Sequence, residues 1–459
     1  MFARTAADHQ VSRRLRLKNA LFKLAPLITG AAWVWVIMMS LEVVPITSAS
    51  RATTLLLMAG AVLFNISTLL KKSSAAWALA LFGLTVFLHH YLNTPLAPSL
   101  GAMSFATVIM LLLGIGILRR YLESQNIQHV IENMLGQPWL RKSPYPLFLV
   151  YGALTFLLSL AVVPLVGALT RHTKLDHIDH VRVAMRSVGS TMFLAPTTVG
   201  AAAVALMFPN IEWGQALLIG IPLAGGMMVL TCLSKPAEIR EEDGVSADGV
   251  SNLQWLYQLV GLFALIFTAS KALFGLGTVT AVALTVSMAG AISVVHSQGW
   301  KSLAQSVHSS FRTSSAEILM FIACGTLLVA LQSPEASSSL QQMADNLASH
   351  LNSPSLQALV IVGGLPLLTI CGIHPMVLFS AFFPIVHALS NVGMEVEYHW
   401  WIAMFVISQL ISPVSISAVA AASATGLSSW NVSFRLHAIF AVLLAGYCIV
   451  YLWLVAALR

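Results

Sequence analysis

The chain has 459 residues, of which 58% are hydrophobic and 9% are charged. About a quarter of the residues in a water-soluble domain are charged, so this composition excludes a soluble globular protein and indicates a chain surrounded by lipid. The formal net charge of +7 does not indicate nucleic-acid binding, because the basic residues stand between apolar segments, where membrane topology explains them.

The N-terminal segment 1–26 is basic. Its cationic residues are Arg4, Arg13, Arg14, Arg16, Lys18 and Lys23. A basic start followed by Ser48-Ala49-Ser50 is typical of a signal peptide with its cleavage site, but the apolar stretch Pro26–Val44 is longer than the usual apolar core of such peptides. We therefore expect an uncleaved first span, with segment 1–26 in the cytoplasm.

Apolar segments of about 20 residues, long enough to cross a bilayer as a helix, recur along the chain. About eleven transmembrane helices are expected, at 26–44, 53–70, 75–95, 101–118, 178–208, 213–233, 254–274, 277–297, 314–332, 398–425 and 434–457. The predicted fold class is an all-α polytopic membrane protein. It has a first half at 27–233, a cytoplasmic linker at 234–253 and a second half at 254–459.

Two apolar segments, 145–170 and 355–390, remain outside this set. Basic residues stand on both sides of the first, at Arg141 and Lys142 and again at Arg171 and Lys174. A crossing segment would place one basic flank on the wrong side of the membrane, whereas a re-entrant hairpin from the cytoplasm satisfies both. We expect its tip near Val163-Pro164, and a matching hairpin that enters from the outside at 355–390.

The distribution of basic residues predicts the orientation. Most of the 24 Lys and Arg residues fall in loops assigned to the cytoplasm, whereas only Arg51, Lys271 and Arg459 fall on the opposite side. This bias follows the positive-inside rule and places the C-terminus outside the cell. Arg186 falls within a span instead.

The two hairpin segments begin a weak internal repeat. In each copy a Ser-Pro pair, Ser143-Pro144 or Ser353-Pro354, precedes the hairpin. A helix interrupted by proline then follows, at 178–208 and at 398–425. Because an odd number of expected spans separates the copies, the repeats should have opposite orientations.

Proline marks the breaks at Pro164, Pro196, Pro375 and Pro413. It removes a helical hydrogen bond, and at membrane depth the freed backbone survives only when it is buried in protein or lines a wet cavity. Hydroxyl groups gather beside these breaks, so Na⁺ could bind near Thr197, Thr198, Ser412 and Ser415. The alternative is a plain proline kink in which the hydroxyls bond to nearby backbone carbonyls. Because matched breaks occur in both repeats, a binding site is the favoured interpretation.

The substrate site expected from this pattern surrounds the hairpin tips and the broken helices. Its residues are Val163, Pro164, Arg186, Ser190, Thr191, Pro196, Thr197, Thr198, Gly372, His374, Pro375, Gln409, Ser412, Pro413 and Ser415. Arg186 is interpreted either as an anion clamp or as a side chain that extends to the cytoplasmic surface. His374 is interpreted either as a structural hydrogen-bonding residue or as a carrier of a coupling proton. Glu317, near the start of an expected span, is interpreted as interfacial.

This architecture resembles the ion transporter superfamily, which includes divalent anion/sodium symporters and citrate or arsenite permease-like carriers. The resemblance lies in eleven spans, two opposed hairpins and two interrupted helices, over residues 27–457. The symporters' Ser-Asn-Thr tip signature is absent, since the tips read Val162-Val163-Pro164 and Gly372-Ile373-His374-Pro375. The resemblance implies a secondary carrier with a midplane site, often dimeric, whose transport domain moves like an elevator.

The function predicted from the sequence is transport of a small, anionic solute across the bacterial inner membrane, coupled to Na⁺ or H⁺. The expected partners are this solute and the lipid bilayer, with a homodimer left open and nucleic acid excluded. Neither a cofactor nor a resident metal is expected, and the chain is not expected to be an enzyme. A lipid-phosphate flippase or a membrane-embedded enzyme is the alternative.

Overall fold

A computed structural model describes residues 24–63, 65, 73–125, 127, 144–159, 162–172, 177–234, 254–336, 342, 346 and 353–458. Helices and their connections make up this part of the chain, and no strand occurs in it. Most of the basic N-terminal segment, most of the expected linker and the flanks Arg141, Lys142 and Lys174 lie outside the described residues.

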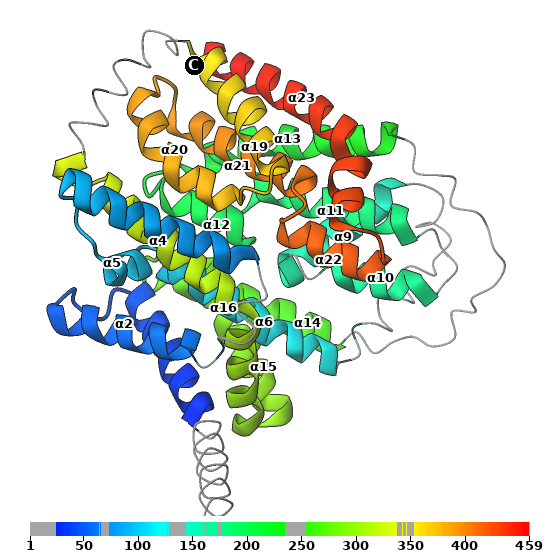
Figure 1. The fold of residues 1–459 in the computed structure, drawn as a ribbon. Coiled ribbons are helices and arrows are strands. Elements are labelled where there is room, and N and C mark those ends of the chain that lie inside the picture. Colours follow the sequence, from blue (N-terminus) through cyan, green and yellow to red (C-terminus); the bar gives the residue numbers. More distant parts are fainter. Residues whose placement is uncertain are drawn as a thin grey trace, which may run out of the picture.

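One set of helices packs around the long α16 and is called the α16 group here. It contains α2 (Ser48–Leu63), α4 (Ser73–Leu92), α5 (Pro98–Ser104), α6 (Ala106–Ser124), α14 (Gln254–Ala272), α15 (Thr278–Gln298) and α16 (Trp300–Leu331). Helix α16 contacts α4, α5 and α6, while α15 packs against α6 and α14. Thus helices from both halves of the sequence build one body (Figure 1).

The remaining helices form the α11 group. It contains α9 (Pro144–Leu158), α10 (Val162–His172), α11 (His177–Leu194), α12 (Val199–Leu206), α13 (Trp213–Leu233), α18 (Pro354–Ala358), η2 (Leu359–Gly364), α19 (Leu365–Ile370), α20 (Pro375–Leu389), α21 (Met394–Ile411), α22 (Ile416–Thr425), η3 (Asn431–Arg435) and α23 (Leu436–Leu458). Helix α11 contacts α9, α10, α13 and α21, and α21 contacts α19 and α23. The two groups meet mainly where α20 packs on α16 and where α9 and α12 approach α6.

Small residues permit close helix packing inside the α16 group. A Cβ atom added at Gly114 of α6 would lie 2.4 Å from the Oγ of Ser287 on α15. The same serine donates a hydrogen bond to the carbonyl of Met110 (2.9 Å), and Ser310 of α16 donates to that of Leu113 (3.0 Å). Close approach and interhelical hydrogen bonds are the main sources of helix association in lipid, so these contacts hold α6, α15 and α16 together.

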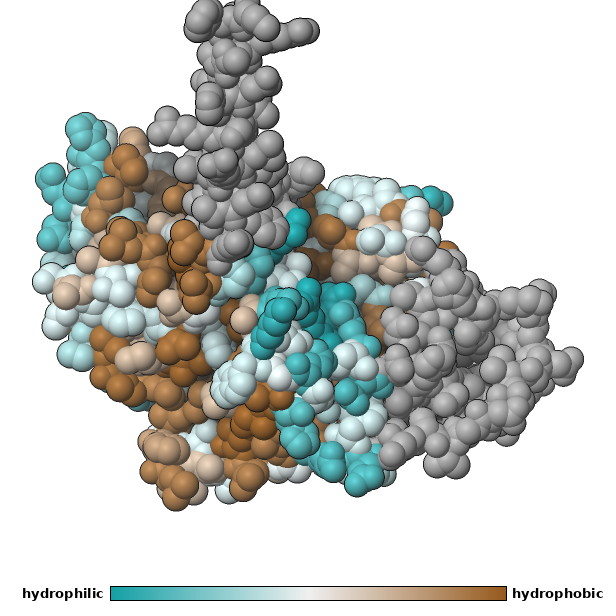
Figure 2. Space-filling model, turned by 90° about the horizontal axis from the view of Figure 1, so that it is seen from below, coloured by the Kyte–Doolittle hydropathy of each residue, from teal (hydrophilic) through white to brown (hydrophobic). Residues whose placement is uncertain are grey.

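The membrane class predicted from composition is confirmed. Eight described helices are long and apolar enough to span a membrane, or nine when the α5–α6 pair, bent by 61°, counts as one span. The expected spans at 26–44 and 53–70 correspond to the shorter apolar helices Leu24–Ser40 and Ser48–Leu63. Apolar side chains cover much of the described surface in Figure 2, as expected of a multi-pass protein whose solvent is lipid.

One expected span begins at the wrong residue. Helix α16 starts at Trp300 rather than near 314, so Lys301 and Arg312 lie in a helix and not in a loop. The polar sequence 301–314 was assigned to a loop because it lacks apolar length. Its buried side, including Ser306, Ser310 and Phe311, packs within the α16 group.

Each expected hairpin segment consists of apolar helices separated by a short break. The first segment divides into α9 and α10, and the second into α18–η2–α19 and α20. The first break precedes Val163 and Pro164, which lie beside it in the first turn of α10. Proline suits a first helical turn because its missing N–H has no partner there anyway. The direction in which each segment enters a membrane stays a prediction.

Candidate functional site

Both proline-interrupted helices are broken where the sequence predicts. The first break separates α11 from α12 at residues 195–198, and the second separates α21 from α22 at residues 412–415. Each new helix starts with a hydroxyl cap, since Thr198 accepts a hydrogen bond from the Ala201 amide (3.3 Å) and Ser415 accepts one from the Ala418 amide (3.1 Å). Such caps satisfy amide groups that have no helical partner.

His374 fixes the start of α20 in the same way. Its Nδ1 accepts a hydrogen bond from the Met376 amide (3.2 Å), so a neutral ring carries its proton on Nε2 and can donate from there. The preceding Gly372 has φ of +90°, a backbone conformation that favours glycine. Its carbonyl accepts a hydrogen bond from Nε1 of Trp77 on α4 (2.8 Å), so the connection before α20 is tied to the α16 group.

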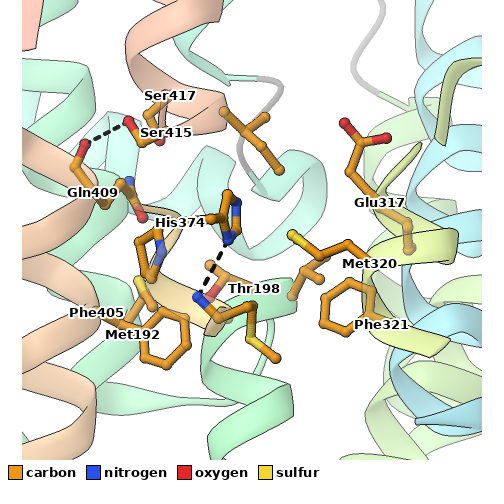
Figure 3. Close-up of a pocket in the computed structure, with 16 residues that line it drawn as sticks. Met192, Thr198, Glu317, Met320, Phe321, His374, Phe405, Gln409, Ser415 and Ser417 are labelled. Atoms are coloured by element: carbon orange, nitrogen blue, oxygen red, sulfur yellow. Dashed lines mark hydrogen bonds between the residues drawn. The ribbon is translucent and has the colours of Figure 1, made fainter. Parts of the chain in front are cut away.

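These breaks and the His374 cap surround a pocket of about 70 Å³ between the two helix groups (Figure 3). The α16 group contributes Leu112, Glu317, Met320 and Phe321 to its lining. The α11 group contributes the other lining residues, which are Met192, Thr198, Val199, Gly200, His374, Pro375, Met376, Phe405, Gln409, Ser415, Ile416 and Ser417. The site is therefore shared between two bodies that touch each other at few other places.

Two polar atoms in this lining have no hydrogen-bond partner among the described residues. They are Nε2 of Gln409 and Oγ of Ser417, and both are buried. The neighbouring Ser415 hydroxyl is engaged, because it donates to the backbone carbonyl of Gln409 (2.8 Å). Buried polar groups normally have partners, so the two unpaired groups indicate a position where a ligand or water completes the bonding.

A second cavity of about 410 Å³, called the vestibule here, continues from the pocket. The two cavities share Leu112, Val199, Glu317 and Ile416. Ser310, Thr313 and Ser314 line the vestibule together with Glu317, and their spacing places them on one face of α16. Arg119, Arg120 and Glu123 of α6 also line it, with Arg119 paired to Glu123 at 2.8 Å. A polar route therefore leads from a charged rim to Glu317.

The structure brings some of the sequence-predicted site residues together. Thr198, His374, Pro375, Gln409 and Ser415 line the pocket, and Pro164 lines the vestibule. Others stand beside the breaks without lining either cavity; these are Pro196, Thr197, Gly372, Ser412 and Pro413. The hydroxyls of Thr197 and Ser412 are buried without a hydrogen-bond partner in the described part of the chain, as oxygen ligands awaiting a cation would be.

Three further predicted residues are buried inside the α11 group. Ser190 donates to the Ser187 carbonyl and Thr191 to the Val188 carbonyl, each at 2.8 Å. Val163 is fully buried. None of the three lines the pocket or the vestibule.

Arg186 also lies away from both cavities. Its side chain is 2% exposed, so it does not extend to the surface as one interpretation required. One guanidinium nitrogen donates to the Ser234 hydroxyl (2.6 Å), and Nε lies 3.4 Å from Nδ1 of His437 on α23. Arg186 thus links α11 to the end of α13 and to α23.

Sequence reasoning missed the α16 side of the pocket. Glu317 was interpreted as interfacial because its span was expected to begin near 314, but it lies well inside α16 and is 8% exposed. A carboxylate inside an apolar helix is costly and usually functional, and this signal was present in the sequence. The apolar lining residues Met192, Met320, Phe321 and Phe405 carried no such signal, because similar residues fill every membrane helix.

Comparisons with known proteins give a likeness of fold. No protein-family model matches the sequence, and no curated protein matches it. Among solved structures, the fold is similar to that of the Alcanivorax borkumensis YdaH transporter, described as having an unusual topology. The TM-score is 0.56 with 16% sequence identity, over 84% of this chain and 97% of that one. This likeness shows the fold alone and does not carry the finer assignment to the ion transporter superfamily.

Proposed function

We propose that this protein is a secondary transporter that moves a small solute across a membrane, coupled to Na⁺ or H⁺. The observation that carries the proposal is the pocket between the α16 and α11 groups, lined by both proline breaks and by the His374 cap. A solute bound there contacts both bodies. A shift of one body against the other would therefore change the side from which the solute is reached.

The sparse contact between the two groups supports such a movement. Each group packs extensively within itself, whereas the contacts between them are limited to a few helix pairs. Interfaces of this kind permit relative motion of domains. The elevator movement implied by the ion transporter superfamily resemblance fits this division, with the α11 group as the moving body.

The helix breaks would supply the binding groups. The N-termini of α12 and α22 carry partial positive charge, roughly half a unit each, and the residues that cap these helices, Thr198 and Ser415, line the pocket. Such half-helices hold anionic groups of substrates in membrane carriers, while loosened backbone and hydroxyls coordinate Na⁺. Thr197 and Ser412, whose buried hydroxyls have no hydrogen-bond partner among the described residues, are the candidates for a cation.

The proposal includes an inner-membrane location in a bacterial cell, with the N-terminus in the cytoplasm and the C-terminus outside. The vestibule would then open to the cytoplasm, because Arg119 and Arg120 line it and basic residues flank spans on the cytoplasmic side. The arrangement described would be the inward-open state. The likeness to the YdaH transporter supports the transport role in general terms.

Uptake by reconstituted protein tests the proposal. Purified protein in liposomes should accumulate a candidate solute faster under an imposed Na⁺ or proton gradient than without one. Empty liposomes and a Thr198→Val, Ser415→Ala double variant serve as controls. Lipid scrambling in place of solute uptake would support a flippase. Chemical conversion of a lipid or solute without transport would support a membrane-embedded enzyme.

A further inference from the structure

A third cavity, of about 500 Å³, lies within the α11 group and is called the lateral groove here. Residues of η2 and α19 line one side of it, residues of η3 and α23 line the other, and Ile407 and Ile411 of α21 lie between them. Every lining residue is apolar or glycine, and the groove shares none of them with the pocket or the vestibule. Its volume is typical of a ligand site, but its chemistry suits only a hydrocarbon.

The lateral groove faces the lipid side of the protein. Ile407 and Ile411 are buried and form its floor, whereas Leu367 on α19 and Ile439 and Val442 on α23 are 58%, 81% and 70% exposed. Helix α23 lies at the edge of the α11 group in Figure 1. Only 28% of its apolar window is buried in the protein, against 78% for the window that contains α21. Lipid chains therefore have direct access to the groove.

Two π-helical turns border the groove. Val362 and Gly363 come from η2, and Phe434 comes from η3. Turns of this kind are rare and occur frequently at functional sites. Their presence on both sides of one cavity indicates that its shape is a specific feature of the fold.

One end of the groove is polar. Arg435 is exposed and directly follows the lining residue Phe434, whose ring stacks on that of the half-exposed Trp430 at 5.0 Å. Tryptophan and basic residues are typical of the boundary between membrane and water. From Phe434 to Ala445 the helix rises by about 16 Å, close to the roughly 15 Å of hydrocarbon in one leaflet. The groove therefore has the length and polarity of one leaflet.

We propose that the lateral groove binds an acyl chain of a phospholipid whose phosphate group is held by Arg435. The chain matches the apolar lining and its length, and a phosphate is a strong partner for a guanidinium group. Because α19 leads to the break at Gly372 while α23 packs on α21, the bound lipid would join the second hairpin segment to these two helices. This site is separate from the transport pocket, so the inference goes beyond the proposed function.

Matched probes test this assignment. The full-length protein, delipidated in detergent, would receive dioleoylphosphatidylglycerol, dioleoylglycerol with the same chains and no phosphate, or glycerol 3-phosphate with no chains. Native mass spectrometry would count the bound molecules, and thermal shift would measure the stabilisation that binding produces. We expect one tightly held phosphatidylglycerol per chain and about fivefold weaker binding of dioleoylglycerol, the usual effect of one basic residue at an anionic headgroup. Glycerol 3-phosphate should not stabilise the protein.

Variants identify the site. Gly363→Phe places a ring in the groove, and its Cβ atom would make only an ordinary contact with Leu359 (3.5 Å). It should weaken phosphatidylglycerol binding about tenfold, as expected when two methylene groups leave an apolar site. Gly446→Phe is the matched control, because this exposed glycine of α23 lies outside the groove with nothing within 4 Å. Arg435→Gln should remove the preference for the phosphate, whereas Arg51→Gln, at an exposed arginine of α2, should keep it.

A second pair of variants serves if Gly363→Phe does not fold. Val442→Asn places a polar group in the groove, and Val450→Asn is its control, since both valines are exposed on α23 but only Val442 lines the groove. Equal lipid binding in a groove variant and its control would overturn the inference, as would equal binding of phosphatidylglycerol and dioleoylglycerol to the wild type. Disulfide cross-linking between two Val442→Cys chains in membranes would place a second copy on the groove instead. These measurements record lipid binding, so their failure leaves the uptake test of the proposed function unaffected.

Discussion

The guanidinium of Arg186, on α11, lies over the ring of Phe440, on α23, at 3.8 Å from the ring centroid. The two residues are far apart in the sequence, and both are buried. A buried cation held against an aromatic face contributes about 2 kcal/mol. This contact therefore fastens the last helix to α11.

The first prediction follows from that contact. Phe440→Leu should lower the melting temperature of the purified protein, because the buried charge loses the ring while its burial remains. A double-mutant cycle with Arg186→Met should give a coupling free energy of about 1–2 kcal/mol. If Arg186→Met leaves stability unchanged and abolishes binding of an anionic cargo, Arg186 acts as the anion clamp considered from the sequence.

A second prediction concerns the hydrogen bond from Trp77 to the Gly372 carbonyl, which joins the two helix groups. Trp77→Phe should destabilise the arrangement of the two helix groups described here by about 1 kcal/mol. The population of this arrangement should therefore fall relative to other arrangements of the same groups. A cysteine at Ser314, in the vestibule, should then react more slowly with a thiol reagent. The control is Trp35→Phe, which removes a bond of the same length (2.8 Å) from the helix Leu24–Ser40 to Thr54 of α2. Equal labelling rates in both variants would contradict the prediction.

The helix caps give a third prediction. Thr198→Val and Ser415→Ala should each destabilise the protein by about 0.5–2 kcal/mol, the usual loss for a removed N-cap, and should weaken cargo binding because both residues line the pocket. Thr285→Val is the control, since that buried hydroxyl bonds to the Ala281 carbonyl within a helix and lies outside the pocket. Chemical unfolding and thermal shift measure the two effects.

Close packing of α5 on α16 gives a fourth prediction. A Cβ atom at Gly101 would lie 2.3 Å from the backbone nitrogen of Thr326, so Gly101→Ala must push the helices apart. Overpacking of this kind typically costs about 1–3 kcal/mol. Gly83→Ala is the matched control, because nothing lies within 4 Å of the added atom there. A melting temperature for Gly101→Ala as high as that of the control would refute the close contact.

The sequence predicts the local features of this fold well. Both broken helices were expected because proline and hydroxyl residues act within a few residues of their own position, and Thr198 and Ser415 cap the new helices as that chemistry requires. Contacts between residues that lie far apart in the chain could not be predicted in this way. Arg186 meets His437 across 251 residues, and no periodic pattern encodes that meeting.

The contribution of α16 to the pocket was missed for a similar reason. The polar residues before Glu317 are typical of a loop, yet they form the first turns of α16 because their buried side packs against neighbouring helices. Once the helix starts at Trp300, Glu317 moves from the expected membrane surface to the pocket. Tertiary packing, which a single sequence does not display, decided both the helix start and the position of this carboxylate.

The last prediction concerns membrane orientation. Asn210 is exposed between α12 and α13, whereas Ser314 lines the vestibule near Arg119 and Arg120. If basic residues mark the cytoplasmic side, a cysteine at 210 should react only with a reagent added outside the cell. A cysteine at 314 should react only from the cytoplasmic side, in a background with the exposed Cys371 replaced by serine. Labelling of position 314 from the outside, with position 210 protected, would reverse the orientation. The described arrangement would then be outward-open.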